Sequence, residues 1–443
     1  MTSQHSTDFR SRLKQEIPHW QQEGIISEEA AAKLTQRYQL DGIQKESSRL
    51  LAAALFTLGG LLLGGGVITF VAANWEEIPT FAKVTMLLAT LLAFHLTGYW
   101  LWYQKGWTRF GHALVFAGCL VFGANIGLMA QIFHVSGKWY GAFLAWSVGS
   151  LIMAYAVRSW LIGMLALATA TIWFSGFNFD SHSSWRSIFP ALIAAVFLPL
   201  AWQISSRVLY TATFLSLTFS LAILTGDKYS SGRFILLAMA VSGLLAWAVG
   251  EFHRSKKIKP EFGNPVAALG MLTLAIAAFI GSFHDVWRSS SYNSDDQILP
   301  FTLLLPALVA GIIALILLIN SLTSHQQSER SFLQIAVISA AIILSICATL
   351  GATHRGDMAL LTIGANIAAL ALAAASIASG LLDERRIAFW FGTLFTVILI
   401  LSRFLEYETS LLLKSAAFIA CGAIVIAVGI AYENYLRRKE LNV

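Results

Sequence analysis

Five polar side chains stand inside or beside long apolar stretches of the chain, where a polar group is costly and is often functional. Asn125 and Gln131 lie in VFGANIGLMAQIFHVSG, and Asn366 lies in a later apolar stretch. Asn74 follows the first such stretch, and Arg403 ends a late one. Each could hold helices together through a hydrogen bond or line a path for a small or lipidic substrate. We predict these five residues as candidates for such a path.

Two further groups are candidates for chemistry. Arg403 and Glu406 are three residues apart, so they could pair as an interfacial anchor or as a charged gate. His95, in LLAFHLTGYWLWY, could act as a proton relay, as the base of a membrane-embedded transferase, or as a structural histidine beside an aromatic belt.

Known catalytic signatures are missing from the sequence. It contains no HExxH, GxSxG, P-loop, CxxC or dinucleotide fingerprint. Four residues between the apolar stretches could meet at a metal, but nothing in their spacing requires it: Asp180, His182, His284 and Asp285. We therefore assign no catalytic residue, no metal and no cofactor.

The composition predicts the elements that position these residues. Apolar residues make up 57% of the chain and charged residues only 12%, whereas soluble domains carry about 25% charged residues. This indicates an all-α, polytopic membrane protein. Its first apolar stretch, 51–73, is long enough to cross a hydrocarbon core of about 30 Å. Gly60 and Gly64 stand there in GxxxG register, which favours close helix packing within the chain, a homodimer contact or a flexible helix beside a substrate.

Thirteen more spans are predicted, giving a bundle of about 14. Two of them, 139–157 and 160–176, are separated only by Arg158-Ser159. The predicted cores are 82–103, 111–131, 139–157, 160–176, 188–204, 208–225, 233–250, 264–283, 299–320, 332–350, 358–380, 387–402 and 411–431.

The charges of the loops predict the threading. Most of the 30 Lys and Arg fall on one side of these spans, and the positive-inside rule makes that side cytoplasmic and places both termini there. The net charge of +6 reflects this asymmetry and does not indicate a nucleic-acid partner. The basic run 253–260, HRSKKIKP, could also contact anionic lipid headgroups.

The polar segment 1–50 is predicted as a cytosolic pair of helices. Phe9–Glu23 has helical composition with Pro18 inside it, Gly24 suits its end, and Ser27 is an N-cap for a second helix. Too short to bury much core, these helices must pack on each other, on the membrane or on a cytosolic protein partner. The predicted organisation is 1–50, a first membrane region 51–180, further spans over 181–431 and a basic tail 432–443.

One short sequence recurs. GANIG at 123–127 returns as GANIA at 364–368, in spans that the threading makes antiparallel. Inverted repeats are common in secondary transporters, but five small residues also match easily by chance.

Three segments resemble a known family of bacterial integral membrane proteins, catalogued as domain of unknown function 2157. They are WQQEGIISEEAAAKL (20–34), GGLLLGGGVITFVAANWEEIP (59–79) and FGANIGLMAQIFHVSG (122–137). The resemblance covers roughly residues 10 to 180, and the tail from 364 is similar to full-length members. Phe133 stands where members often have Tyr. The resemblance implies a bacterial inner-membrane location and supplies no activity or functional residue.

Three functions remain open. The large number of spans and the polar residues within them favour a transporter or permease-like protein, and the scarcity of intramembrane acids disfavours the usual carboxylate-coupled pump. The alternatives are a non-transporting envelope scaffold or sensor that acts through its N-terminal helices, and a membrane-embedded transferase that uses His95.

Overall fold

The structure, a computed structural model, describes residues 7–38, 69, 73–180, 184–228, 232–288, 303–323, 328–352, 357–382, 385–406 and 410–441. The chain forms two compact units, Met1–Met86 and Leu87–Val443. Every regular element within the described ranges is a helix, so the predicted all-α architecture is confirmed. The stretch that carries Gly60 and Gly64 lies outside the described residues.

The first unit begins with two helices, α1 (Thr7–Gln22) and α2 (Glu28–Tyr38). Gly24 turns the chain between them with φ of +72°, a conformation that suits a residue without Cβ. The Ser27 Oγ accepts a hydrogen bond from the Ala30 N–H at 3.3 Å, as predicted for an N-cap. The two helices share a small core, formed by Leu13, Ile17 and Ala31 with Trp20, Ile26, Leu34 and Tyr38 around it.

Thirteen α-helices are described from Thr80 onward, and each predicted span core from 82–103 to 411–431 overlaps one of them. They are α4 (Thr80–Tyr103), α5 (Thr108–Ile132), α6 (Gly141–Val157), α7 (Trp160–Asp180), α8 (Phe189–Ile204), α9 (Arg207–Lys228), α10 (Gly232–Lys256), α11 (Pro260–Gly281), α12 (Leu304–Thr323), α13 (Ser328–Ala352), α14 (Met358–Leu382), α15 (Arg386–Glu406) and α16 (Leu411–Leu441). Two short 3-10 helices, η1 (Ser184–Ile188) and η2 (His284–Trp287), precede α8 and follow α11.

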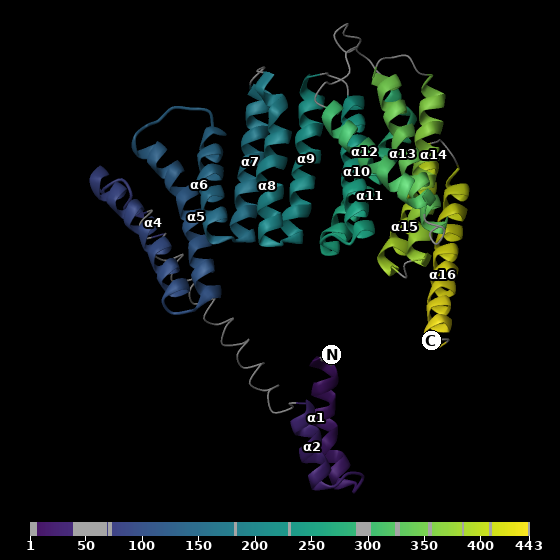
Figure 1. Ribbon diagram of the computed structural model, residues 1–443, viewed down its shortest axis with the longest axis horizontal. Coiled ribbons are helices and arrows are strands. Elements are labelled where there is room, and N and C mark those ends of the chain that lie inside the picture. The colour runs from purple at the N-terminus through teal and green to yellow at the C-terminus, as the bar shows by residue number, and fades with distance from the viewer. Residues whose placement is uncertain are drawn as a thin grey trace. The chain divides into compact units, whose positions relative to one another are not determined.

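Eleven of the described helices are long and apolar enough to cross a membrane, while α6 and the apolar part of α12 are shorter. The predicted break between α6 and α7 is confirmed, because Arg158 takes a left-handed conformation (φ of 52°) that ends α6 two residues before Trp160 begins α7. Figure 1 shows the helices of the second unit side by side. The chain is therefore a polytopic helical membrane protein.

The described part of the second unit has two large apolar cores, beside a small cluster around Phe389 and Tyr432. One lies mainly among α5 to α9 and includes Phe174, Leu200 and Leu209, which are fully buried. The other lies mainly among α10 to α15 and includes Phe234 and Leu274. Helices α10 and α11 both contribute residues to the two cores, so they join the two halves of the unit.

Helices α10 and α11 approach each other through four glycines. Gly243 and Gly250 on α10 face Gly270 and Gly263 on α11. A Cβ on Gly270 would lie 2.3 Å from the backbone nitrogen of Trp247, and one on Gly250 would lie 2.7 Å from the Gly263 oxygen. This contact of backbone with backbone fixes the position of α10 against α11.

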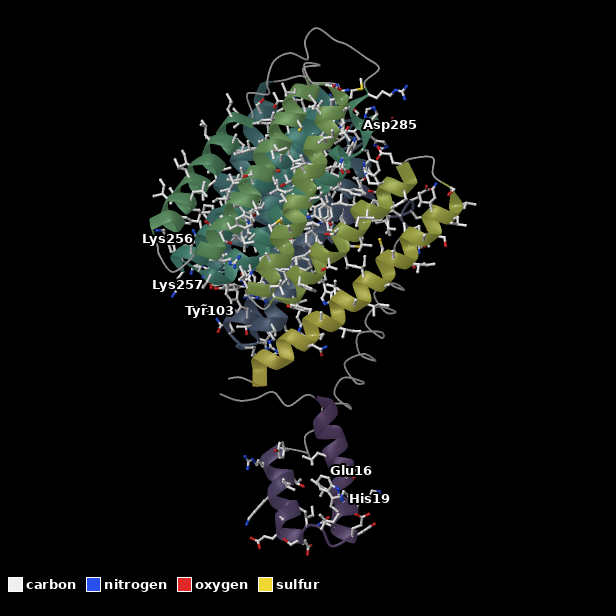
Figure 2. The ribbon with its side chains drawn as sticks, turned by 90° about the vertical axis from the view of Figure 1, so that its right-hand side faces the viewer. Glu16, His19, Tyr103, Lys256, Lys257 and Asp285 are labelled. Atoms are coloured by element: carbon white, nitrogen blue, oxygen red, sulfur yellow. The ribbon has the colours of Figure 1, made fainter. Side chains whose placement is uncertain are left out.

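The second unit has two chemically different ends. Lys256 and Lys257 lie at one end, and Asp285 lies at the other (Figure 2). We call the first the basic end; there α10 and α14 finish and α11, α13 and α15 begin. The other end carries the turn between α11 and η2, and we call it the Ser282 end.

Candidate functional site

A cavity of about 970 Å³ lies at the basic end of the second unit. Its walls come from α9, α10, α11, α13, α14 and α15. A volume of this size is typical of a small-molecule or cofactor site. None of the five residues predicted for a substrate path is among its lining residues.

Charged residues line the mouth of the cavity. Arg254 Nη1 pairs with Glu251 Oε2 at 2.8 Å, and these two side chains are only 21% and 12% exposed. Arg385 Nη2 donates to Asn264 Oδ1 at 2.9 Å. The complete charged set contains four arginines and two glutamates: Arg207, Arg254, Arg385, Arg386, Glu251 and Glu261. The mouth thus carries an excess of positive charge, which favours an anionic ligand.

Hydroxyl and amide groups follow further inward. Ser376 Oγ donates to Leu372 O at 2.9 Å, which satisfies this hydroxyl within α14. Gln334 on α13 is different: only 8% of the residue is exposed, and its Oε1 has no hydrogen-bond partner among the described residues. Leaving a buried acceptor unpaired costs about 1–3 kcal/mol. Buried polar groups are normally paired, so this orphan group in a cavity wall points to a ligand.

The innermost part of the cavity is apolar. Trp247, Met271, Val337 and Phe391 form it, and small side chains on α11 and α14 leave the space open, namely Ala267, Ala268 and Ala375. Leu272, also on the cavity wall, is 44% exposed.

The cavity lining changes from charged to apolar in the same direction along α10 and along α11. Going inward along α10, the order is Arg254, Glu251 and then Trp247. Along α11 it runs from Glu261 to Met271, ten residues further on, which corresponds to about 15 Å at 1.5 Å per residue. The cavity is thus polar at one end and apolar at the other, which suits an amphiphilic molecule.

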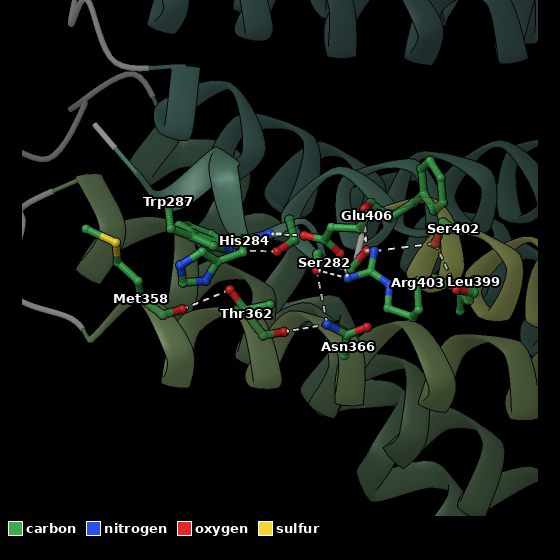
Figure 3. A network of polar contacts seen from close by, with 12 residues as sticks. Ser282, His284, Trp287, Met358, Thr362, Asn366, Leu399, Ser402, Arg403 and Glu406 are labelled. Atoms are coloured by element: carbon green, nitrogen blue, oxygen red, sulfur yellow. Dashed lines mark hydrogen bonds and ion pairs between the residues drawn. The ribbon is translucent and has the colours of Figure 1, made fainter. Parts of the chain in front are cut away.

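At the Ser282 end, two of the predicted path residues meet (Figure 3). Asn366 Nδ2 donates to Ser282 O at 3.1 Å and to Thr362 O at 2.8 Å. Arg403 donates through Nη1 to Ser282 O at 2.6 Å and through Nη2 to Ser282 Oγ at 3.0 Å. These bonds tie α14 and α15 to the end of α11.

The predicted pair of Arg403 with Glu406 is present in the same network, at 2.5 Å. The other carboxylate oxygen of Glu406 accepts the backbone N–H of His284 at 2.7 Å. Nearby, the buried Arg233 donates to Trp287 O at 2.7 Å and to Gly351 O. Guanidinium groups and backbone carbonyls thus close this end of the bundle around the turn after α11.

The other predicted path residues lie elsewhere. Asn125 on α5 is buried and donates from Nδ2 to Leu87 O on α4 at 2.9 Å. Gln131 is exposed near the end of α5. Asn74 lies half-buried in the turn before α4, in the first unit. The structure brings Asn366 and Arg403 together and leaves Asn125 in a separate helix contact; a path role for these residues stays a prediction.

His95 packs between α4 and α5. Its Nδ1 lies 2.9 Å from Leu91 O in its own helix, and its ring occupies the space that Gly118 leaves open. This contact accounts for a glycine at 118, because a Cβ there would lie 2.6 Å from the imidazole.

The residues considered for a metal do not form a site in the part of the chain that the structure describes, where no three His, Cys, Asp or Glu side chains cluster. Asp180 instead pairs with Lys138 and accepts a hydrogen bond from Tyr140 Oη at 2.8 Å. The hydrogen bond to this carboxylate raises the pKa of Lys138. His182 lies outside the described residues.

Sequence reasoning missed the cavity and its residues. Gln334 is the third residue of a predicted span, 332–350, where a polar side chain is ordinary. The only sequence signals were the spacing of Glu251 and Arg254 and the seven-residue spacing of glycines at 243/250 and 263/270.

Comparison with known proteins bears on the first part of the chain. No curated protein and no solved structure matches the chain. The cavity residues, from 207 onward, all lie beyond the segment that a family model matches. That family is described as predicted membrane protein (DUF2157), and the resemblance to it is confirmed over residues 18–163, from within α1 to the beginning of α7.

Proposed function

We propose that this membrane protein takes a small or lipidic amphiphile into the cavity at its basic end and passes it through the bundle, as a permease does. The observation that carries the proposal is the cavity itself, which is open among charged residues at the basic end and bounded by packed helices further in. On α14, Ala368, Ala369 and Leu372 are fully buried between the cavity and the Ser282 network. This arrangement corresponds to a carrier that is open to one side.

The orientation in the membrane is part of the proposal. The positive-inside rule favours a cytoplasmic basic end, since Lys256, Lys257 and Arg386 lie there. The family suggests a bacterial inner membrane. In this orientation the cavity faces the cytoplasm, and the Ser282 network closes the outer side.

Cysteine accessibility tests the proposal. Ser376 lines the cavity, and Asn366 belongs to the Ser282 network ten residues earlier on α14, about 15 Å away. Ser376→Cys and Asn366→Cys would be introduced separately into a variant that lacks the native cysteines, Cys119, Cys347 and Cys421. A membrane-impermeant thiol reagent would then be applied to intact cells and to inverted vesicles.

We expect Ser376→Cys to react from the basic side, and Asn366→Cys to react from the opposite side whenever the carrier opens there. Ser255→Cys, exposed at the end of α10, is the positive control, and Ser220→Cys, buried on α9, is the negative control. Protection of Ser376→Cys from both sides in a folded protein would contradict the cavity as an entry site. Lasting protection of Asn366→Cys would contradict passage through the bundle.

An envelope scaffold or sensor is the second candidate, because α1 and α2 share a core of their own. Ile25, in the turn between them, is 64% exposed and could contact a soluble partner. Ile25→Asp in the full chain should then abolish capture of that partner without reducing labelling of Ser376→Cys. The transferase reading predicts that His95→Gln removes an activity while the protein still folds.

A further inference from the structure

We propose that the cavity binds an anionic phospholipid whose phosphate ester carries a hydroxylated head, with phosphatidylglycerol as the simplest example. The phosphate lies among the arginines of the mouth, a head hydroxyl bonds to Gln334, and the tail follows the apolar inner wall. This inference rests on the proposed function, since it names the substrate class of the same cavity.

The arginines at the mouth fit a phosphate. A guanidinium group presents planar, paired N–H donors that match phosphate oxygens. The Arg207 guanidinium has no partner among the described side chains, and Arg386 is 60% exposed with only a 3.5 Å contact to Glu433. Both can turn to a ligand without giving up a buried ion pair, whereas Arg254 is already balanced by Glu251.

Gln334 specifies a hydroxyl. Its Oε1 is buried in the cavity wall with no donor among the described residues. A hydroxyl can donate and accept, so it satisfies the carboxamide whichever of its two ends faces the cavity. A quaternary ammonium head could do neither, which separates glycerol heads from choline heads.

The inner wall fits a tail that comes from the bilayer. Trp247, Met271 and Phe391 offer apolar surface beyond the polar zone, and Leu272, on the same wall, is 44% exposed. A lipid can enter along this edge with its tail still in hydrocarbon. A soluble phosphate ester would leave the apolar half of the cavity unfilled, and this favours the lipid.

The test uses the full-length protein in a neutral detergent. Native mass spectrometry measures lipid retention, and the shift of the unfolding temperature measures binding during titration. The probes are phosphatidylglycerol, phosphatidylcholine, phosphatidylmethanol (anionic, without a head hydroxyl) and soluble glycerol 3-phosphate. We expect saturable binding of phosphatidylglycerol that is at least tenfold tighter than that of phosphatidylcholine, and no comparable effect of glycerol 3-phosphate.

Two variants test recognition of the phosphate and of the head hydroxyl separately. The double variant Arg207→Gln with Arg386→Gln should weaken both anionic lipids about tenfold and leave phosphatidylcholine unchanged. Gln334→Leu should weaken phosphatidylglycerol about fivefold to tenfold and leave phosphatidylmethanol unchanged. Matched controls outside the cavity are Arg109→Gln on α5 and Gln104→Leu in the turn before it, which should change neither.

Three results would overturn the inference. The first two are equal binding of phosphatidylglycerol and phosphatidylcholine, and an equal effect of Gln334→Leu on both anionic lipids. The third is full saturation by glycerol 3-phosphate alone, which would assign the site to a soluble phosphate ester. These failures are separate from that of the proposed function. If Ser376→Cys reacts but the protein shows no lipid preference, only the lipid inference is rejected. If phosphatidylglycerol binds tightly but Asn366→Cys stays protected from both sides, only the proposed passage through the bundle is rejected.

Discussion

The two ends of the second unit carry the same kinds of side chain in different surroundings. At the Ser282 end, the ion pair of Arg403 with Glu406 lies beside Asn366, whose amide donates to two carbonyls. At the basic end, the ion pair of Arg254 with Glu251 lines the same cavity as Gln334, whose Oε1 has no partner among the described residues. In both pairs the residues are three apart on one helix.

The difference shows how polar residues in a membrane protein divide into those that hold helices together and those that await a ligand. Residue type does not separate them, because each end has an arginine, a glutamate and a carboxamide. The pairing of the carboxamide and the open space do separate them, because Asn366 donates to two carbonyls whereas Gln334 Oε1 has no partner among the described residues. The Ser282 end is closed by bonds to backbone carbonyls, whereas the basic end keeps about 970 Å³ open.

The largest expected effect comes from removing the cation at the closed end. Arg403→Met should destabilise the protein by about 3 kcal/mol, because it leaves Glu406 partly buried without its partner and frees the turn at Ser282. The free energy of unfolding in detergent micelles measures this. The double variant Arg403→Met with Glu406→Leu should recover part of the loss. If the single variant were as stable as the parent, the network would not be structural.

A smaller loss of stability is expected from adding a side chain at the α10–α11 contact beside the cavity. Gly270→Ala should cost about 2 kcal/mol, because its Cβ would press on the backbone of Trp247 and force α10 from α11. Gly311→Ala on α12 meets nothing within 4 Å and is the matched control. Thermal unfolding of both variants checks the difference, and equal stability would show that the α10–α11 contact yields easily.

The carboxamide of the closed end should matter less. Asn366→Leu should cost about 1 kcal/mol, the usual worth of a hydrogen bond between membrane helices. Asn125→Leu should behave alike, because Asn125 also donates to a carbonyl of another helix. Unfolding measurements that find no loss for Asn366→Leu would instead favour the path role predicted for this residue.

The smallest effect is expected at the open end. In lipid-free detergent, Gln334→Leu should leave the free energy of unfolding unchanged or raise it by up to about 1 kcal/mol, since an unpaired buried acceptor disappears. The same unfolding assay applies. A loss as large as that of Asn366→Leu would mean that Gln334 is already satisfied, and the contrast between the two ends would fail.

Much of the fold could be predicted because its causes are local. The break at Arg158 follows from two neighbouring apolar runs with a polar residue between them, and the Ser27 cap follows from the residue types around it. The pairing of Arg403 with Glu406 follows from helical spacing alone. In each case the partners lie within a few residues of one another.

The candidate site could not be predicted in this way. Asn366 meets Ser282 across 84 positions of the chain, and the cavity gathers residues from six helices. Sequence alone flagged Asn366 as unusual and passed over Gln334, which lies near the end of its predicted span. Only the packing shows that the first is satisfied and the second is not.

The sequence by itself determined that the chain is a polytopic helical membrane protein and roughly where its described helices lie, because hydrophobicity and helical propensity act over a few turns. The tertiary structure decided which polar groups are paired and where space remains. Those properties depend on how close helices approach, and here the approach is set by four glycines between α10 and α11 and by the carbonyls around Ser282. Such contacts join residues far apart in the chain, so no local pattern encodes them.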